Sequence, residues 1–372
     1  MPAKIAFLLG GAARNIRGGF KVLFIYANFL AQQGFAVTIF FPATNSTNRR
    51  GDRAARTLRY VAGKLYSSLY LPESWFDLHP SIETRWIWRC GPELSAEFDV
   101  SIIAGHEAGG DVLEEGAGGV RARGKLLYLF QEYEYYMIGG VTVRSQIEAL
   151  IRRVDTVVAI SPAAREVAEA VRGPRGVHLV SNGVEFEKYF MSGPRSFGER
   201  KTLGFAFREE NFKRSGDVVA ALSLLRSRGL LQGVACWAYG TRRRPGLPDW
   251  IRYHYRASDS TLRELLNSTA VFVVASLFEG WGLPGAEAMA CGAALVTTRN
   301  GGCEAYATHM ENALLCAPGN VEELAEAIRR LLQDLELAER IATRGHESIQ
   351  AFTWEAAAAG FLRCMRETLN KA

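Results

Sequence analysis

Two glutamates, Glu279 and Glu287, flank a glycine-rich turn in the stretch "SLFEGWGLPGAEAMACG". An apolar run precedes Glu279 and predicts a strand, and Pro284 suits the first turn of a following helix, which puts Glu287 in that turn. Carboxylates accept hydrogen bonds from vicinal hydroxyls, helix-start N–H groups attract phosphate, and Gly280 and Gly282 permit close backbone approach. This turn could bind a ligand with hydroxyl and phosphate groups. Ordinary helix-start chemistry explains Glu287 but not Glu279.

Two cations follow another predicted strand in "GFAFREENFKRSGD", namely Arg208 and Lys213. Ligands of open parallel sheets bind beyond the carboxyl ends of the strands. There an arginine can grip a diphosphate with two hydrogen bonds and a lysine can act as a point charge while the leaving group becomes negative. On this fragment alone a surface charge run is the stronger interpretation, with Glu209 and Glu210 pairing Lys213 and Arg214.

The elements that position these residues are short apolar runs alternating with helical patterns, which predicts parallel α/β sheets. A chain of 372 residues is too long for one ordinary core and suits two domains. The pattern restarts after a linker near "SNGVEFEKYFMSGPRSFGERK", so we expect domains at 1–187 and 188–350. The expected strands are 4–10, 35–42, 98–105, 125–130, 156–161, 176–183, 201–207, 233–240, 270–276 and 293–298; the expected helices are 20–34, 215–229, 259–269, 285–292 and 320–334.

The composition, 48% hydrophobic and 22% charged, is normal for a soluble globular protein. The formal net charge of +5 comes without the dense Lys/Arg clusters of nucleic-acid binders, so no nucleic-acid partner is expected. A mildly basic chain suits anionic small molecules or an anionic membrane surface.

Cysteine and apolar patterns indicate a cytosolic chain. The six cysteines form no CxxC, so reduced, buried thiols are expected rather than a zinc or redox site. No run reaches the ~18 apolar residues of a membrane-spanning helix. The opening "MPAKIAFLLGGAAR" breaks at Gly10 and Gly11, which indicates a strand and a glycine-rich loop rather than a signal peptide.

Several catalytic motifs are missing from the sequence. It holds no GxxxxGK[ST], GxSxG or HExxH, and no GxGxxG follows the first strand. These absences exclude a P-loop and weaken a dinucleotide oxidoreductase interpretation. No Asp-x-Asp pair is present to hold a metal-bound nucleotide diphosphate, so a diphosphate would need protein cations and no metal is expected.

The least regular segment, 48–92, combines basic and aromatic residues. Such a mixture could touch a membrane surface or a glycan. We favour a solvated Arg-rich helix followed by an aromatic strand in the core, because aromatic residues are mostly buried. The residues are Arg49, Arg50, Arg53, Arg56 and Arg59, then Tyr60, Tyr66, Tyr70, Trp75, Trp86 and Trp88.

Several spaced motifs resemble, in order, the retaining glycosyltransferases of family 4, which have the GT-B fold. "EGWGLPGAE" is similar to their E-x7-E motif, "FREENFK" to their R-x4-K diphosphate motif, and "VSNGVEFEKYF" to their linker. The resemblance is strong from Lys201 to about Arg366 and weak before it. It implies two Rossmann-like α/β domains facing each other across a cleft, with a last helix at 351–372 crossing back to the first.

The resemblance implies donor-side roles. Arg208 and Lys213 would bind the diphosphate, Glu279 the hydroxyls of the transferred sugar and Glu287 the ribose. Backbone from Gly280, Gly282, Leu283 and Pro284 would line the sugar and phosphates, Gly18 and Gly19 would form the glycine-rich loop, and the nucleobase would lie near Tyr255 or Arg256.

On the acceptor side, "DVSIIAGHEAGG" resembles the family region that puts His106 and Glu107 in the cleft. A structural histidine at a strand end is an equal alternative for His106. Where the family often has a second histidine, "LFQEYEYYM" has Gln131 and Glu132, similar to some rhamnosyltransferase-type members. Glu132 and Tyr133 become acceptor-side candidates; the alternative is a polar strand end that caps the next segment.

The implied reaction is metal-independent transfer of a hexosyl or deoxyhexosyl group from a nucleotide-diphosphate-sugar donor to a hydroxyl, with retention. Catalysis would rest on Glu279, Arg208, Lys213 and His106, with no cofactor and no enzyme nucleophile. The acceptor would be a glycan, a lipid-linked saccharide or a small molecule, with a place in polysaccharide biosynthesis in the cytoplasm or at the inner membrane face. The rivals are a non-catalytic nucleotide-sugar or glycan-binding protein, a sugar-nucleotide epimerase and a nicotinamide oxidoreductase.

Overall fold

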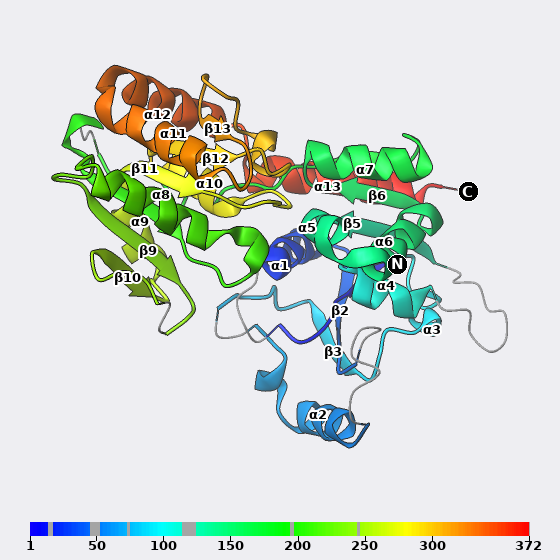
Figure 1. The fold of residues 1–372 in the computed structure, drawn as a ribbon. Helices are drawn as coiled ribbons and strands as arrows, with labels where there is room; N and C mark the ends of the chain where they lie inside the picture. Colours follow the sequence, from blue (N-terminus) through cyan, green and yellow to red (C-terminus); the bar gives the residue numbers. More distant parts are fainter. Residues whose placement is uncertain are drawn as a thin grey trace. The chain divides into compact units, whose positions relative to one another are not determined.

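The computed structural model describes residues 1–13, 18–44, 53–72, 75–113, 124–193, 197–243 and 246–371. The chain forms two compact units (Figure 1). The first unit comprises Met1–Asn182 and Glu355–Ala372, and the second comprises Gly183–Trp354.

The first unit is built on a seven-stranded parallel sheet with strand order β3-β2-β1-β4-β5-β6-β7. Its central strands are almost wholly apolar and buried, as expected for a parallel sheet covered on both faces. The strand order reverses between β1 and β4, the topological switch point at which ligands of such sheets bind. The strands are β1 Lys4–Leu8, β2 Ala36–Pro42, β3 Glu83–Ile87, β4 Val100–Ile103, β5 Lys125–Phe130, β6 Thr156–Ala159 and β7 Val177–Leu179.

The helices of the first unit include the last helix of the chain. Phe361 of that helix stacks on Tyr26 of α1 with 4.2 Å between ring centroids. Its Thr368 hydroxyl donates to Thr156 Oγ1 on β6 at 2.7 Å. The helices are α1 Gly18–Gln32, α2 Arg53–Leu65, α3 Pro92–Ser95, α4 His106–Val112, α5 Tyr133–Ile138, α6 Gly140–Arg153, α7 Pro162–Arg172 and α13 Trp354–Leu369, with the 3-10 turn η1 at Ser67–Leu69.

The second unit repeats the design with six strands in the order β10-β9-β8-β11-β12-β13. Its switch point lies between β8 and β11, which pair in parallel. The strands are β8 Thr202–Ala206, β9 Ala235–Gly240, β10 Ile251–Tyr255, β11 Thr269–Val274, β12 Ala294–Thr298 and β13 Leu314–Cys316. The helices are α8 Ser215–Ser227, α9 Asp259–Asn267, α10 Leu283–Ala290, α11 Val321–Gln333 and α12 Leu335–Ile349, with 3-10 turns η2 Phe197–Glu199, η3 Asn211–Lys213 and η4 Cys303–Ala305.

The predicted strands and helices are confirmed, with ends shifted by a few residues. Strands β10 and β13 and helices α4 to α7 and α12 were not predicted. Strand β10 was missed because "IRYHY" mixes charge with aromatic residues, which an edge strand tolerates. In segment 48–92 the Arg-rich helix is α2, and the aromatic strand is β3, whose Trp86 is buried as predicted. The expected burial is wrong for Tyr66, which follows α2 and is 62% exposed. Arg49 and Arg50 lie outside the described residues.

Candidate functional site

Lys213 and Glu279 form a largely buried ion pair at the switch point of the second unit. Lys213 follows β8 and Glu279 follows β11, and the Nζ atom donates to Glu279 Oε2 at 2.7 Å. The side chains are 19% and 12% exposed. The alternative of a surface charge run is therefore wrong for Lys213. Glu209 pairs instead with Arg242, and Arg214 with Asp217.

The surrounding loop fixes the Glu279 carboxylate. Ser276 donates from its hydroxyl to Glu279 Oε1 at 2.7 Å, and the Glu279 N–H donates to Asn300 O at 3.0 Å. A Cβ on Gly302 would lie 2.6 Å from Glu279 O, so only glycine fits there. Each carboxylate oxygen has two lone pairs, so both can still accept a ligand hydroxyl. Ser276, Asn300 and Gly302 were missed by sequence reasoning, although "SLFEG" and "RNGG" contain them.

The glycine turn leads into α10 through Gly282, whose φ of 91° and close approach to Cys303 Sγ exclude a side chain. Its carbonyl accepts from the Tyr306 hydroxyl at 2.6 Å. Leu283 and Pro284 form the first turn of the helix, and Gly280 is buried before it.

The predicted position of Glu287 in the first turn is wrong. Because Gly282 caps the helix and Leu283 starts it, Glu287 lies one turn further along, where it is 9% exposed. Helix-start chemistry therefore does not account for Glu287, because the dipole effect falls off within the first turn.

Tyr239, at the end of β9, links the predicted charged groups. Burial raises the pKa of the Tyr239 hydroxyl far above its usual value, the Arg208 charge opposes that rise, and the Glu287 and Glu279 carboxylates add to it. The Arg208 guanidinium also lies over the Tyr239 ring, 5.2 Å from its centroid. Two carboxylates and one cation thus act on a single hydroxyl. The sequence offered no signal for Tyr239 beyond its place at a strand end.

Arg208 itself is anchored by its backbone. Its N–H donates to Ser215 Oγ at 2.8 Å, and Ser215 Oγ donates to the Arg208 carbonyl at 2.9 Å. These bonds tie the loop after β8 to the first residue of α8. The guanidinium is thereby held at the same end of the sheet as Lys213.

Tyr255 and Arg256 lie at the end of the edge strand β10. Tyr255 is 40% exposed, and the Arg256 guanidinium lies 5.5 Å from the centroid of its ring. Arg256 has a φ of 48° and donates its N–H to Gly240 O at 2.8 Å. Two strands, β9 and β8, separate this exposed cation–aromatic pair from β11 and Glu279.

In the first unit, His106 and Glu132 form a buried pair at the ends of the neighbouring strands β4 and β5. His106 Nδ1 lies 2.8 Å from Glu132 Oε1, and the His106 N–H donates to Oε2 at 2.7 Å. The Tyr128 hydroxyl donates to the same Oε2 at 2.8 Å. Burial lowers the pKa of His106, but the hydrogen bond and charge of Glu132 and the charge of Glu107 outweigh it, and the net pKa is raised.

Of the predicted acceptor-side residues, Glu132 binds His106, while Gln131, Glu107 and Tyr133 make other contacts. Glu132 is 9% exposed and holds His106; it precedes α5 but makes no side-chain cap there. Gln131 donates to Gly19 O at 3.3 Å. A Cβ on Gly10 would meet Glu107 Oε2 at 2.2 Å, so the loop after β1 passes close to that carboxylate. Tyr133 begins α5 and packs against the core beside it.

The glycine pair predicted as a loop is helical. Gly18 and Gly19 are the first residues of α1 and are exposed. Gly19 lies within reach of Gln131, so this helix start belongs to the same end of the sheet as His106.

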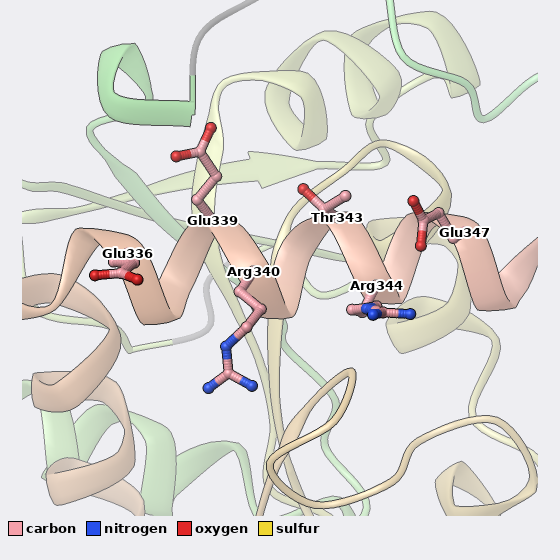
Figure 2. Close-up of a pocket in the computed structure, with 6 residues that line it drawn as sticks. All are labelled: Glu336, Glu339, Arg340, Thr343, Arg344 and Glu347. Atoms are coloured by element: carbon pink, nitrogen blue, oxygen red, sulfur yellow. The ribbon is translucent and has the colours of Figure 1, made fainter.

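Other candidate sites are few in the part of the chain that the structure describes. There, no group of three His, Cys, Asp or Glu could hold a metal ion, and no helix is long and apolar enough to cross a bilayer. The free cysteines are buried. Figure 2 shows a depression along α12 whose lining includes none of the predicted site residues, being Glu336, Glu339, Arg340, Thr343, Arg344 and Glu347.

Comparison with known proteins shows what this chain resembles in sequence and in fold. Residues 244–348 match the family model described as Glycosyl transferases group 1, a segment that contains Glu279 and Glu287. The model covers less than a third of the chain. The structure of the Anabaena protein Alr3699/HepE in complex with UDP and glucose superposes with a TM-score of 0.71 at 17% identity, over 98% of this chain and 100% of that one. The chain has the GT-B fold.

Curated relatives include a sugar-phosphate synthase and a mannosyltransferase. Alpha-maltose-1-phosphate synthase of Mycobacterium tuberculosis is 29% identical over 58% of this GT-B chain and 64% of its own length. MMP alpha-(1->4)-mannosyltransferase of Mycolicibacterium hassiacum is 34% identical over 31% of this chain and 28% of its own length. The chain thus spans less than two thirds of the curated relatives it matches.

Proposed function

We propose that this protein is a retaining glycosyltransferase of family 4 that transfers a sugar from a nucleotide-diphosphate-sugar to a hydroxyl acceptor. The observation that carries the proposal is the Lys213–Glu279 pair at the ends of β8 and β11, a cation for phosphate beside a carboxylate for hydroxyls. The Anabaena protein of the same fold was solved with UDP and glucose and also with UDP-glucose. A donor of that chemical class suits the charges gathered here.

In this proposal Arg208 and Lys213 hold the diphosphate, and the backbone from Gly280 to Pro284 lines it. Glu279 accepts hydroxyls of the transferred hexose or deoxyhexose, and Glu287 accepts those of the ribose. Tyr255 and Arg256 are assigned to the nucleobase, since an exposed aromatic ring with a neighbouring guanidinium can stack on one.

The proposed step breaks the bond between the anomeric carbon and the β-phosphate oxygen while the acceptor oxygen bonds to the same face of that carbon. The acceptor proton passes to the leaving phosphate oxygen, so atoms and charge balance without an enzyme nucleophile. Arg208 and Lys213 stabilise the charge that develops on the diphosphate. Because these cations are part of the protein, we propose that transfer needs no metal ion and no cofactor.

We assign the acceptor to the first unit, at the end of the sheet that carries His106. The raised pKa of His106 favours an imidazolium that donates hydrogen bonds to a hydroxyl or phosphate oxygen. Gln131 and Glu107 lie at the same end, whereas Glu132 serves as the partner that orients His106. The acceptor is a glycan, a lipid-linked saccharide or a small molecule, and the protein works in the cytoplasm.

The test begins with a thermal-shift screen of nucleotide sugars, because a ligand that binds only the native state raises its stability. Transfer from the best donor is then measured with chelator present. We expect Glu279→Ala and Arg208→Ala to lower kcat by about 10²–10³-fold, and the control Glu339→Gln on α12 to change nothing. Near wild-type transfer by both site variants would overturn the assignment.

Two rival outcomes are distinguishable in the same assay. Donor binding without product would indicate a non-catalytic binding protein. Conversion of the donor sugar with no acceptor present would indicate an epimerase. A requirement for Mg²⁺ or Mn²⁺ after chelation would contradict the metal-free step.

A further inference from the structure

Helix α2 turns its apolar side away from the protein. Leu58, Val61 and Leu65 recur at spacings of three and four residues and therefore share one face of the helix. They are 71%, 48% and 71% exposed. In a surface helix of a globular protein such a stripe normally faces the core. In α2 the apolar stripe faces solvent instead.

The opposite side of α2 is held against β3, which fixes the orientation of the helix. Trp86 Nε1 donates to Tyr60 O at 2.9 Å, and the Tyr60 ring meets the Trp88 ring edge-on at 5.5 Å. A Cβ on Gly63 would lie 2.3 Å from the Trp86 indole, so the helix packs closely there. Figure 1 shows α2 beyond β3, the last strand on that side of the sheet.

The apolar surface continues beyond the end of α2. Tyr66 directly follows the helix and is 62% exposed, and Leu69 in η1 is 37% exposed. A tyrosine suits the boundary between water and hydrocarbon, because its ring is apolar and its hydroxyl is polar.

The charged residues of α2 and of the segment that follows it up to Pro72 are all basic. No acidic residue occurs from Arg53 to Pro72. At 3.6 residues per turn, Arg59 and Lys64 fall on the two borders of the apolar face, and both are exposed. Long basic side chains at such borders can reach lipid phosphates while their stems cover apolar surface.

We propose that this surface docks onto an anionic phospholipid bilayer. The helix would lie in the plane of the interface with its apolar face in the acyl boundary and its basic borders at the headgroups. We call it the α2 face, comprising Leu58, Arg59, Val61, Lys64, Leu65 and Tyr66. The inference does not rest on the proposed transferase activity.

A second copy of this chain is a poorer occupant, because self-pairing would bring Arg59 and Lys64 toward their counterparts, and like charges repel. The exposed face of α12 provides a contrast, since it combines the acidic Glu336, Glu339 and Glu347 with the basic Arg340 and Arg344 (Figure 2). Such mixed charge is typical of a face that stays in water. The single sign on α2 favours an anionic partner.

The experiment is flotation of the full chain with vesicles of phosphatidylcholine, alone or mixed with phosphatidylglycerol. We expect binding only to the mixed vesicles, weakened by salt. Leu58→Ser with Leu65→Ser should weaken binding at least about tenfold, because the variant loses apolar side chains that the bilayer would bury. Arg59→Gln with Lys64→Gln should weaken it on the order of tenfold.

Matched controls come from α12. Leu335 is 54% exposed, so Leu335→Ser removes an exposed leucine from another helix, and Arg340→Gln with Arg344→Gln removes two exposed charges (Figure 2). These variants should bind as the wild type does. All substituted positions are exposed, so circular dichroism and thermal melting should be unchanged.

Three results would overturn the proposal. The wild type could fail to float with either vesicle, the α2 variants could bind as tightly as the α12 variants, or the wild type could bind soluble polyglutamate and no vesicle. The last result would identify an acidic polypeptide as the partner. Binding is scored without glycosyl transfer, so failure of the proposed reaction leaves this test interpretable.

Discussion

Both sheets carry a buried, hydrogen-bonded carboxylate at their carboxyl ends, but the cationic partner of the carboxylate differs. In the second unit Glu279 accepts from Lys213 and from the Ser276 hydroxyl. In the first unit Glu132 accepts from His106 and from the Tyr128 hydroxyl. Each carboxylate is buried and accepts from one cationic group and one hydroxyl. Glu279 follows a strand of the switch point itself, whereas Glu132 follows β5, the neighbour of the switch-point strand β4.

The difference lies in the cation. A lysine paired with a buried carboxylate keeps its charge across physiological pH, whereas a histidine can lose its charge there. The Lys213–Glu279 pair therefore suits a constant task, such as holding a diphosphate and a sugar. The His106–Glu132 pair suits a group whose protonation matters, such as one that faces a hydroxyl acceptor.

Of the substitutions considered, removal of Lys213 should have the largest effect on transfer. We expect Lys213→Met to lower kcat about 10²-fold, because the developing charge on the diphosphate loses a cation. It also leaves the buried Glu279 carboxylate without its cationic partner, which should lower the free energy of unfolding by about 1–3 kcal/mol. Urea denaturation and transfer kinetics measure the two effects.

A double variant separates the effect on transfer from the effect on stability. Lys213→Met combined with Glu279→Gln removes the unpaired charge, so part of the lost stability should return while transfer stays low. Arg329→Met, which breaks the surface pair with Glu326, should change neither quantity. Return of activity in the double variant would contradict the assigned roles.

The sequence predicted the strands and helices around Glu279 and Arg208 in the second unit, because these candidate residues stand in local motifs. Glu279, Gly282 and Pro284 lie within one turn, and Arg208 and Lys213 lie within another. Glu287 was placed one turn too early because the capping role of Gly282 depends on a backbone conformation, φ 91°, that the letters do not specify. Tyr239 and Ser276 were missed because only strand pairing and loop closure bring them to the charged groups.

The first unit was harder to predict because its contacts join distant segments. Glu132 and His106 are 26 residues apart, and nothing in "LFQEYEYYM" shows that the carboxylate turns inward to the end of β4. The outward apolar face of α2 was missed for a related reason. A helical stripe normally indicates the core side, and only the packing of Gly63 on Trp86 reveals the opposite orientation.

A smaller effect is expected from the first pair. Glu132→Gln keeps the shape of the side chain but removes its charge, so His106 and Tyr128 donate to a weaker acceptor. We expect the free energy of unfolding to fall by about 1–3 kcal/mol and kcat to fall less than in Lys213→Met. The exposed control is Glu97→Gln on the same unit, which should match the wild type. A larger loss of transfer than in Lys213→Met would show that the His106–Glu132 pair matters more for transfer than the Lys213–Glu279 pair.

The smallest expected effect is a pH dependence confined to the first pair. The pKa of His106 in the folded protein is raised above its ordinary value of 6.5, through Glu132 and Glu107 acting against burial. A raised pKa contributes stability that is fully present below 6.5 and is lost as pH rises through the folded value. Urea denaturation between about pH 5 and pH 8 should therefore show the stability of the wild type falling relative to Glu132→Gln as pH rises. The other histidines contribute equally to both proteins and cancel in the difference, and one pKa unit corresponds to only about 1.4 kcal/mol. A difference that stays constant with pH, or that grows as pH rises, would show that His106 is not held as an imidazolium.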